Sequence, residues 1–337
     1  MRKGPIIFLL FSIAIILFLL NLMLGPVTIP VGTLFSLMKG TVVDDLSRNI
    51  LLQIRFPQSL TAIMAGAGLA TAGLLMQTLF RNPLAGPDVL GITSGAGLGV
   101  AVVTMFTGAW IVYMPQLGVL SLILSAMAGA MVVLLTILAL SQRIKDNAML
   151  LITGLMMGYI SSAAVGVLTV YSSAENLQAF TLWGLGTFSA VSWDRMNWFA
   201  GFTIVALFMA MLLTKPLNML LIGERYASNL GLRVGRTRFI VLFCAGLLTA
   251  SVTAFCGPIA FIGVATPHIT RLALGGSDHR ILLPANMLIG ASVALLCNLI
   301  ARMPGVEGAL PINAVTSLMG APIVIWVVLT RHKRKYA

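Results

Sequence analysis

The side chains in this sequence that could do chemistry are few and widely separated. Three cysteines, Cys244, Cys256 and Cys297, lie in or beside apolar segments and form no CxxC pair. Metal and redox sites need thiols at close spacing, so we interpret these cysteines as core residues. His268 follows Pro267 near an expected membrane boundary, where a lone histidine is more typical of a structural residue than of a metal or haem ligand. These residues predict no metal site and no bound cofactor.

The common catalytic motifs are also absent. No lysine precedes Ser or Thr, so the sequence has no G-x-x-x-x-G-K-[ST] loop to hold ATP phosphates. HExxH and GxSxG are missing as well, which removes the usual zinc and serine hydrolase sites. A membrane-embedded enzyme would need paired catalytic groups at membrane depth, and none is found. The sequence predicts a protein that is not itself an enzyme.

The composition is that of a membrane protein. The chain is 59% hydrophobic and 9% charged, with a mean hydropathy of +1.02, whereas soluble domains carry about 25% charged residues. We therefore expect an all-α integral membrane protein with one transmembrane domain over residues 1–337. About ten membrane-spanning helices are expected, with segment 258–272 the least regular because it contains Pro258 and Pro267. The predicted helices are 5–24, 57–79, 91–107, 116–140, 147–170, 196–213, 238–256, 258–272, 281–301 and 311–330.

The basic residues fix the expected orientation. Of 21 Lys and Arg, only Lys39, Arg48, Arg55, Arg195 and Arg302 fall on the side opposite the N-terminus when ten spans are drawn. Cytoplasmic loops retain basic residues because moving them across the bilayer is costly. Both termini are therefore expected in the cytoplasm. The net charge of +12 lies in short loops and not on one basic face, so no nucleic-acid partner is predicted.

Polar groups at membrane depth are scarce. No Asp, Glu, Lys or Arg stands in the middle of a predicted helix, although ion-coupled carriers usually place such groups there. Gln77 and Asn298 are the nearest polar candidates, and we interpret both as helix–helix hydrogen-bonding residues. The energy for transport is expected to come from another chain. An ion-coupled secondary transporter acting alone remains the alternative.

Small residues recur every fourth position on two predicted helices. Ala62, Gly66 and Ala70 do so on 57–79, and such a face lets helix backbones approach closely. On 147–170 the small residues are Gly154, Gly158, Ser162 and Gly166. Helix packing explains both rows. The row on 147–170 can alternatively border a translocation pathway.

Long motifs identify a family. Residues 55–99 read RFPQSLTAIMAGAGLATAGLLMQTLFRNPLAGPDVLGITSGAGLG, and the sequence continues with LITGLMMG at 151–158, LWGLGTFSAVSW at 182–193 and LNMLLIGERYASNLGL at 217–232. GPIAFIGVATPHITRLALGGSDHR at 257–280 and ALPINAVTSLMGAPIVIWVVL at 309–329 follow in order. Nearly the whole chain resembles FecCD-type (BtuC-like) permeases of ABC importers, which carry iron-siderophores, haem or vitamin B12.

The resemblance implies an assembly. It would contain a homodimer of permeases, or a pair with a paralogous permease, in the bacterial inner membrane. Two cytoplasmic ABC ATPase subunits would hold ATP and Mg²⁺, and an extracytoplasmic binding protein would deliver the cargo. Import of a metal chelate by alternating access is the implied function, with an iron-siderophore the most frequent cargo.

The implied coupling element lies in residues 214–237. Glu224 stands in the first turn of a predicted short helix, where the helix dipole favours a negative charge, and Gly231 suits its C-terminal stop. The alternative is a solvated loop helix without a partner. The residues assigned to coupling are Gly223, Glu224, Arg225, Ala227, Leu230 and Gly231.

The resemblance also implies a docking site and a gate. Arg55 and Arg302 stand at outer helix ends, where family arginines meet glutamates of the binding protein; interfacial anchoring is the alternative. Gln58 replaces a second arginine found in a relative, so docking can use fewer charges or Arg48. Near the cytoplasmic gate the resemblance places Asn82, Leu84, Asp146 and Asn147; the row of small residues on 147–170 adds Gly154, Gly158 and Ser162 as pathway candidates. A simple turn role for Asn82 and helix-cap roles for Asp146 and Asn147 explain these residues equally well.

Overall fold

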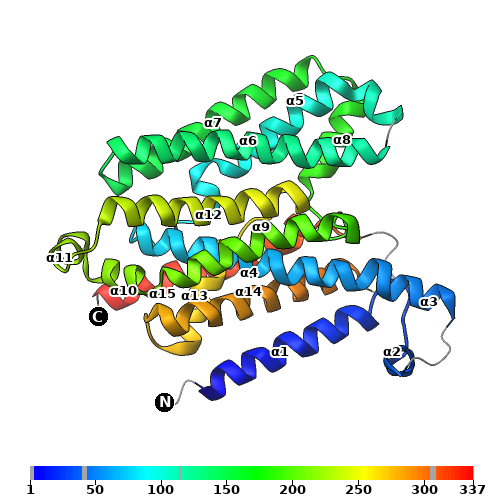
Figure 1. Ribbon diagram of the computed structural model, residues 1–337, viewed down its shortest axis with the longest axis horizontal. Helices are drawn as coiled ribbons and strands as arrows, with labels where there is room; N and C mark the ends of the chain where they lie inside the picture. Colours follow the sequence, from blue (N-terminus) through cyan, green and yellow to red (C-terminus); the bar gives the residue numbers. More distant parts are fainter. Residues whose placement is uncertain (1–3, 40–43, 114, 304–308, 337) are drawn as a thin grey trace.

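A computed structural model describes residues 4–39, 44–113, 115–303 and 309–336 of the chain, and within these ranges the only regular elements are helices. The helices lie roughly side by side along the long axis of the molecule (Figure 1). Helix α11 lies at one end of this bundle, together with the start of α1 and the end of α15. Helices α2, α3 and α8 lie at the opposite end. We call these the inner and the outer end.

All ten predicted segments coincide with helices. Their bounds are α1 (Gly4–Met23), α4 (Phe56–Leu79), α5 (Ile92–Tyr113), α6 (Pro115–Arg143), α7 (Asn147–Val170), α9 (Trp193–Leu212), α12 (Val234–Cys256), α13 (Ile262–Leu274), α14 (His279–Ala301) and α15 (Ile312–Tyr336). Within the described residues, seven helices are long and apolar enough to cross a membrane: α1, α4 with its N-terminal extension, α6, α7, α9, α12 and α14. Shorter apolar stretches occur in α5 and α15. The count of ten spans therefore stays a prediction.

Several short helices join these long ones. They are α2 (Val31–Met38), α3 (Asp45–Asn49), the π-helical η1 (Ile50–Arg55), the 3-10 turn η2 (Pro87–Leu90), α8 (Ala174–Gly184), α10 (Thr214–Ile222) and α11 (Glu224–Asn229). Helix α3 and η1 run directly into α4. The basic N-terminal residues Arg2 and Lys3 lie outside the described residues, as do the side chains of the C-terminal basic tail.

Helix α4 is the core of the bundle because its small residues admit close neighbours. A Cβ on Gly66 would stand 2.2 Å from Gly290 O of α14, and one on Gly73 would stand 1.7 Å from Gly263 O of α13. Three helices can therefore pack nearly backbone to backbone. In its most apolar window 83% of the residues are buried, against 17% for α7. The packing role predicted for the row on 57–79 is confirmed.

The predicted helix 258–272 is corrected at its start. Helix α13 begins only at Ile262, after Phe261 at a φ of +67°. Pro258 lacks an amide hydrogen and disfavours a helical residue before it. The irregular backbone is held by α15, since Asn313 Oδ1 accepts the Ala260 amide at 3.2 Å. Unwound backbone at membrane depth requires such a partner.

Candidate functional site

Helix α11 has the form predicted for a coupling element. Gly223, at a φ of +126°, separates it from α10, and Gly231, at +89°, ends it. The Leu232 amide donates to Ala227 O at 3.0 Å, which satisfies a carbonyl at the helix end. Ala227 is fully buried against the bundle, whereas Tyr226 and Leu230 are 67% and 65% exposed. The sequence therefore predicted the helix and its glycine boundaries correctly.

Glu224 is connected to the bundle more firmly than a dipole argument predicts. Arg238 of α12 donates to Oε1 and Oε2 of Glu224 at 3.1 and 3.3 Å. Asn147, the first residue of α7, donates to Oε1 at 3.0 Å. Arg238 is 5% exposed and also donates to Ile144 O at 3.2 Å. A buried arginine needs such a partner charge, so this pair holds α11 against α12 and α7.

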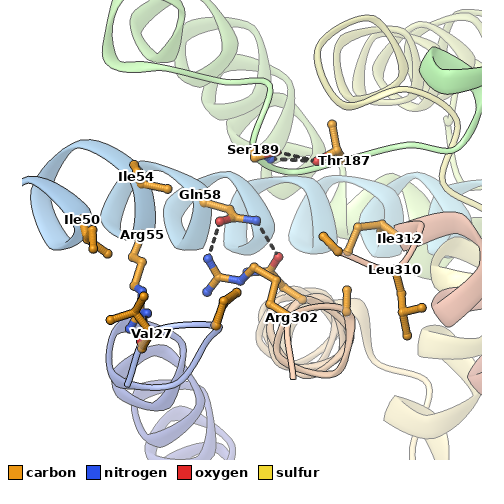
Figure 2. A pocket seen from close by; sticks show the side chains of 14 residues that line it. Val27, Ile50, Ile54, Arg55, Gln58, Thr187, Ser189, Arg302, Leu310 and Ile312 are labelled. Atoms are coloured by element: carbon orange, nitrogen blue, oxygen red, sulfur yellow. Dashed lines mark hydrogen bonds between the residues drawn. The ribbon is translucent and has the colours of Figure 1, made fainter. Parts of the chain in front are cut away.

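A cavity of about 310 Å³ opens at the other end, beside Arg55 and Arg302 (Figure 2). Arg302 is 8% exposed and donates to Gln58 Oε1 and, at 3.0 Å, to Asn21 O. Gln58 in turn donates to Asn298 Oδ1 at 3.1 Å. Burial, and then the charge of Arg55, lower the pKa of Arg302 to about 10, so the group stays protonated at neutral pH.

Arg55 is likewise occupied by its own chain. It is 3% exposed and donates to Leu22 O and Met23 O, both at 2.8 Å, and to Val27 O. The guanidinium therefore fastens the segment after α1 to the start of α4. The predicted docking role of Arg55 and Arg302 remains a prediction, and a partner carboxylate would have to enter the cavity to meet them. Arg48, by contrast, is exposed on α3.

Asn298 and Gln77 have the helix–helix roles predicted for them. Asn298 donates to Asn21 Oδ1 of α1 at 2.8 Å. Gln77 donates to Val264 O of α13 at 3.1 Å and accepts from Arg271 at 2.6 Å. Each amide satisfies groups from another helix, which a buried amide requires.

The predicted gate residues lie in a turn and a helix cap. Asn82 Oδ1 accepts the Leu84 amide at 3.0 Å, and Asp146 Oδ1 accepts the Met149 amide at 2.8 Å. Of the two predicted caps on α7, Asp146 is confirmed, and Asn147 is corrected because it is the first helical residue. Leu84 is 45% exposed. His268 lies 2.8 Å from Pro83 O, so it has the structural partner predicted for it. The gating role itself stays a prediction.

The small row of α7 divides into two parts. A Cβ on Gly154 would stand 2.8 Å from Leu90 Cα, and Gly158 faces Gly91 Cα at 3.5 Å. These two glycines pack against η2 and the start of α5. Ser162 and Gly166 are exposed. The packing interpretation therefore holds for the first half of the row, and the pathway role of Gly154, Gly158 and Ser162 stays a prediction.

Sequence reasoning missed the depth of Asp88. Residues 80–90 were expected to form a loop on the cytoplasmic side, yet η2 packs beside Gly154 and Gly158, two to three turns along α7. Asp88 is exposed there, and its Oδ1 accepts from Thr93 Oγ1 at 2.9 Å. A carboxylate thus lies alongside a predicted membrane span. The signal in the sequence that could have indicated this depth is the Pro- and Gly-rich NPLAGP stretch directly before Asp88.

Comparison with known proteins decides the family. A model of the FecCD transport family matches residues 13–330. The chain belongs to the FecCD transport family. The vitamin B12 import system permease protein BtuC of Escherichia coli O9:H4 (strain HS) is 38% identical over 282 residues, covering 83% of this chain and 84% of the relative. The BtuC protein of Shigella boydii serotype 18 shows the same identity and coverage.

A solved structure agrees with the fold of this FecCD chain. It is described as an inward-facing conformation of an ABC transporter of the metal-chelate type. The TM-score is 0.85 at 29% identity, covering 97% of this chain and 99% of the other. PsaBC from Streptococcus pneumoniae, in complex with Fab, matches with a TM-score of 0.50 at 15% identity, which supports a shared fold alone.

Proposed function

We propose that this chain is the transmembrane permease subunit of an ABC importer that moves a metal chelate inward by alternating access. Two copies, or one copy and a paralogous permease, would enclose the pathway in a bacterial inner membrane with both termini in the cytoplasm. Two ABC ATPase subunits would bind ATP and Mg²⁺ at the inner end. A binding protein would deliver cargo at the outer end. Family membership and the form of the inner end support this proposal.

The exposed face of α11 is the observation that carries it. Tyr226 and Leu230 are large apolar residues on a short helix at the inner end, and Arg225 is exposed beside them. Ala227, on the opposite face, fixes the helix to the bundle. Exposed apolar groups on a well-anchored element are typical of a protein-binding surface. An ATPase subunit that receives this helix would account for the exposure.

The candidates for the cargo come from the family and its relatives. An iron-siderophore is our first candidate because it is the most frequent cargo of such permeases. Haem and cobalamin are the others, and the BtuC relatives, which import vitamin B12, favour testing cobalamin early. The pathway would lie between two subunits, so each chain would offer few cargo contacts.

Reconstitution tests the proposal. The chain, its ATPase and its binding protein would be purified together in lipid, and ATP hydrolysis and uptake measured with ferric siderophores, haem and cobalamin. One chelate should stimulate both rates. Uptake driven by a proton or sodium gradient without the ATPase would overturn the proposal in favour of a secondary transporter.

The gate can be tested in the same preparation. Cysteines at Leu84 should crosslink across the two subunits in one nucleotide state and not in another. Leu84 suits this test because its side chain is exposed beside the turn. Pairs that stay beyond reach in every nucleotide state would contradict the gate assignment.

A further inference from the structure

Three helix ends meet at a single side-chain amide. Asn147 Nδ2 lies 3.3 Å from Leu79 O, at the C-terminus of α4, and 3.0 Å from Glu224 Oε1, at the start of α11. An amide nitrogen carries two hydrogens, so it can donate to both acceptors at once. Asn147 thereby connects the buried core helix, the first residue of α7 and the first residue of α11.

The two sides of this junction differ in how firmly they are held. Most of α4 is buried by its neighbours, whereas only 17% of the residues in the most apolar window of α7 are buried. Elements with few buried contacts have the lower free energy of local displacement. A force applied through Glu224 should therefore move the N-terminal turn of α7 and leave α4 in place.

The helix before α11 belongs to the fixed part. Asn218 of α10 donates to Asp278 Oδ1 at 2.7 Å and accepts the His279 amide at 2.9 Å. These bonds tie α10 to the N-terminus of α14. Gly223, between α10 and α11, has a φ of +126°, a conformation that glycine adopts without steric cost. The chain can hinge there, so a load on α11 would be carried by the contacts of Glu224 and Ala227 while α10 stays with α14.

The junction is not fully satisfied in this conformation. Asn147 Oδ1 and Arg238 Nε are buried, and neither has a hydrogen-bond partner among the described residues. Buried polar atoms without partners are costly. A second arrangement of α7 and α11 that gives these atoms partners would gain hydrogen bonds. Such a gain would stabilise the second arrangement, which a junction that alternates between two conformations needs.

We propose that Asn147 transmits displacement of α11 to α7, acting as the positioning residue that links the ATPase-binding helix to the inner part of the pathway. The inference rests on the proposed function. In the proposed motion, ATP drives α11 to turn about Gly223, which shifts Glu224 and the hydrogen bonds that Glu224 accepts from Arg238. Asn147 then follows Glu224 and changes its distance from Leu79. Gate movement depends on this amide, while ATPase binding depends on the exposed face of α11.

The test uses the reconstituted complex of permease, ATPase and binding protein. A spin label would replace Met149, which is 59% exposed on the first turn of α7, in both subunits. The change of the label-to-label distance on ATP binding would be measured with Asn147 intact and in Asn147→Ala. Asn49→Ala, an exposed asparagine at the outer end, is the matched control. Uptake per ATP hydrolysed would be measured alongside.

We expect Asn147→Ala to abolish the ATP-dependent distance change and to lower uptake per ATP by at least about 5-fold, the lower end of the usual coupling between two sites. Complex assembly should be unchanged. Glu224→Gln removes the charge but keeps the side-chain length, so it should lower the same ratio, and the double variant should be no worse than the more impaired single one.

Two results would overturn the inference while leaving the proposed function intact. One is a full distance change in Asn147→Ala; the other is additive loss in the double variant. A wild-type complex without ATP-driven uptake would instead remove the proposed function and this inference together. If Asn147→Ala does not assemble, the Glu224→Gln measurement decides alone: an unchanged ratio overturns the inference, and a lowered one supports it.

Discussion

Replacing Arg302 by alanine should destabilise the permease on its own, before any binding protein is added. The guanidinium serves Gln58 Oε1 and Asn21 O, and Gln58 continues the chain of hydrogen bonds to Asn298. Arg302→Ala leaves two buried acceptors without donors. These bonds join α1, α4 and the end of α14 at the outer end, so their loss should be felt by the whole bundle.

The size of the effect follows from these contacts. Each buried group left unpaired costs about 1–3 kcal/mol. Removing a buried cation returns part of that cost, because Arg302 is desolvated and repelled by Arg55. We therefore expect the free energy of unfolding to fall by about 2–4 kcal/mol. The free energy of unfolding of Arg302→Lys should lie between those of the wild type and Arg302→Ala, since an ammonium group keeps the charge but lacks the planar fork that reaches both acceptors.

Unfolding of the purified permease in mixed micelles, followed by titration with a denaturing detergent, measures this quantity. Arg48→Ala is the control, because Arg48 is exposed on α3 and surface substitutions usually stay within about 0.5 kcal/mol. Affinity for the binding protein would be measured in parallel at low and high salt. If Arg302→Ala unfolds like the wild type yet loses salt-sensitive binding, the structural assignment is refuted and the docking prediction is supported.

Three further substitutions probe other parts of the chain. Gly73→Ala should prevent correct folding, judged by monodisperse purification, because its Cβ would stand 1.7 Å from Gly263 O, whereas Gly68→Ala, with its nearest atom at 3.5 Å, should be tolerated. Ala227→Pro should keep the bundle folded but abolish ATP-coupled uptake, since proline inside α11 breaks its last turns; a full-rate transporter would contradict the coupling role. Asp88→Asn should leave ATP-driven uptake within a few-fold of wild type. If the wild type instead takes up cargo in response to a proton gradient and Asp88→Asn abolishes that uptake, the secondary transporter is favoured.

The helices could be predicted from the sequence because membrane helices are recognised from short-range sequence signals. Apolar length, the Gly223 and Gly231 boundaries and the Asp146 cap are all short-range signals, and each was found where expected. The start of α13 was misjudged because the Ala260 amide, in the irregular segment after Pro258, donates to Asn313, 53 positions away. Periodicity contains no information about such a partner.

The site residues show the same division between local and distant information. Gln58 was read as a missing docking charge, yet it is the residue that joins Arg302 to Asn298. Glu224 was placed by its helix position, but its partners Arg238 and Asn147 belong to other helices. Both assignments required knowing which helices pack together. Side-chain pairing across helices follows from tertiary packing, which one sequence without its fold does not reveal.

The two ends of α4 explain how a protein with so few charges can be both rigid and mobile. At the outer end, Gln58 and the two buried arginines bind α4 to its neighbours through hydrogen bonds between largely buried groups. At the inner end, Gln77 bonds to α13 and Thr78 Oγ1 lies 2.9 Å from His279 Nε2 of α14, whereas the carbonyl of Leu79 accepts from Asn147 of α7 at 3.3 Å. A helix that is held at both ends by α13, α14 and α1, and joined to α7 by this one longer bond, can serve as the frame against which α7 pivots. Weakening the outer network should therefore slow or misdirect gating even though no residue there lies near α11.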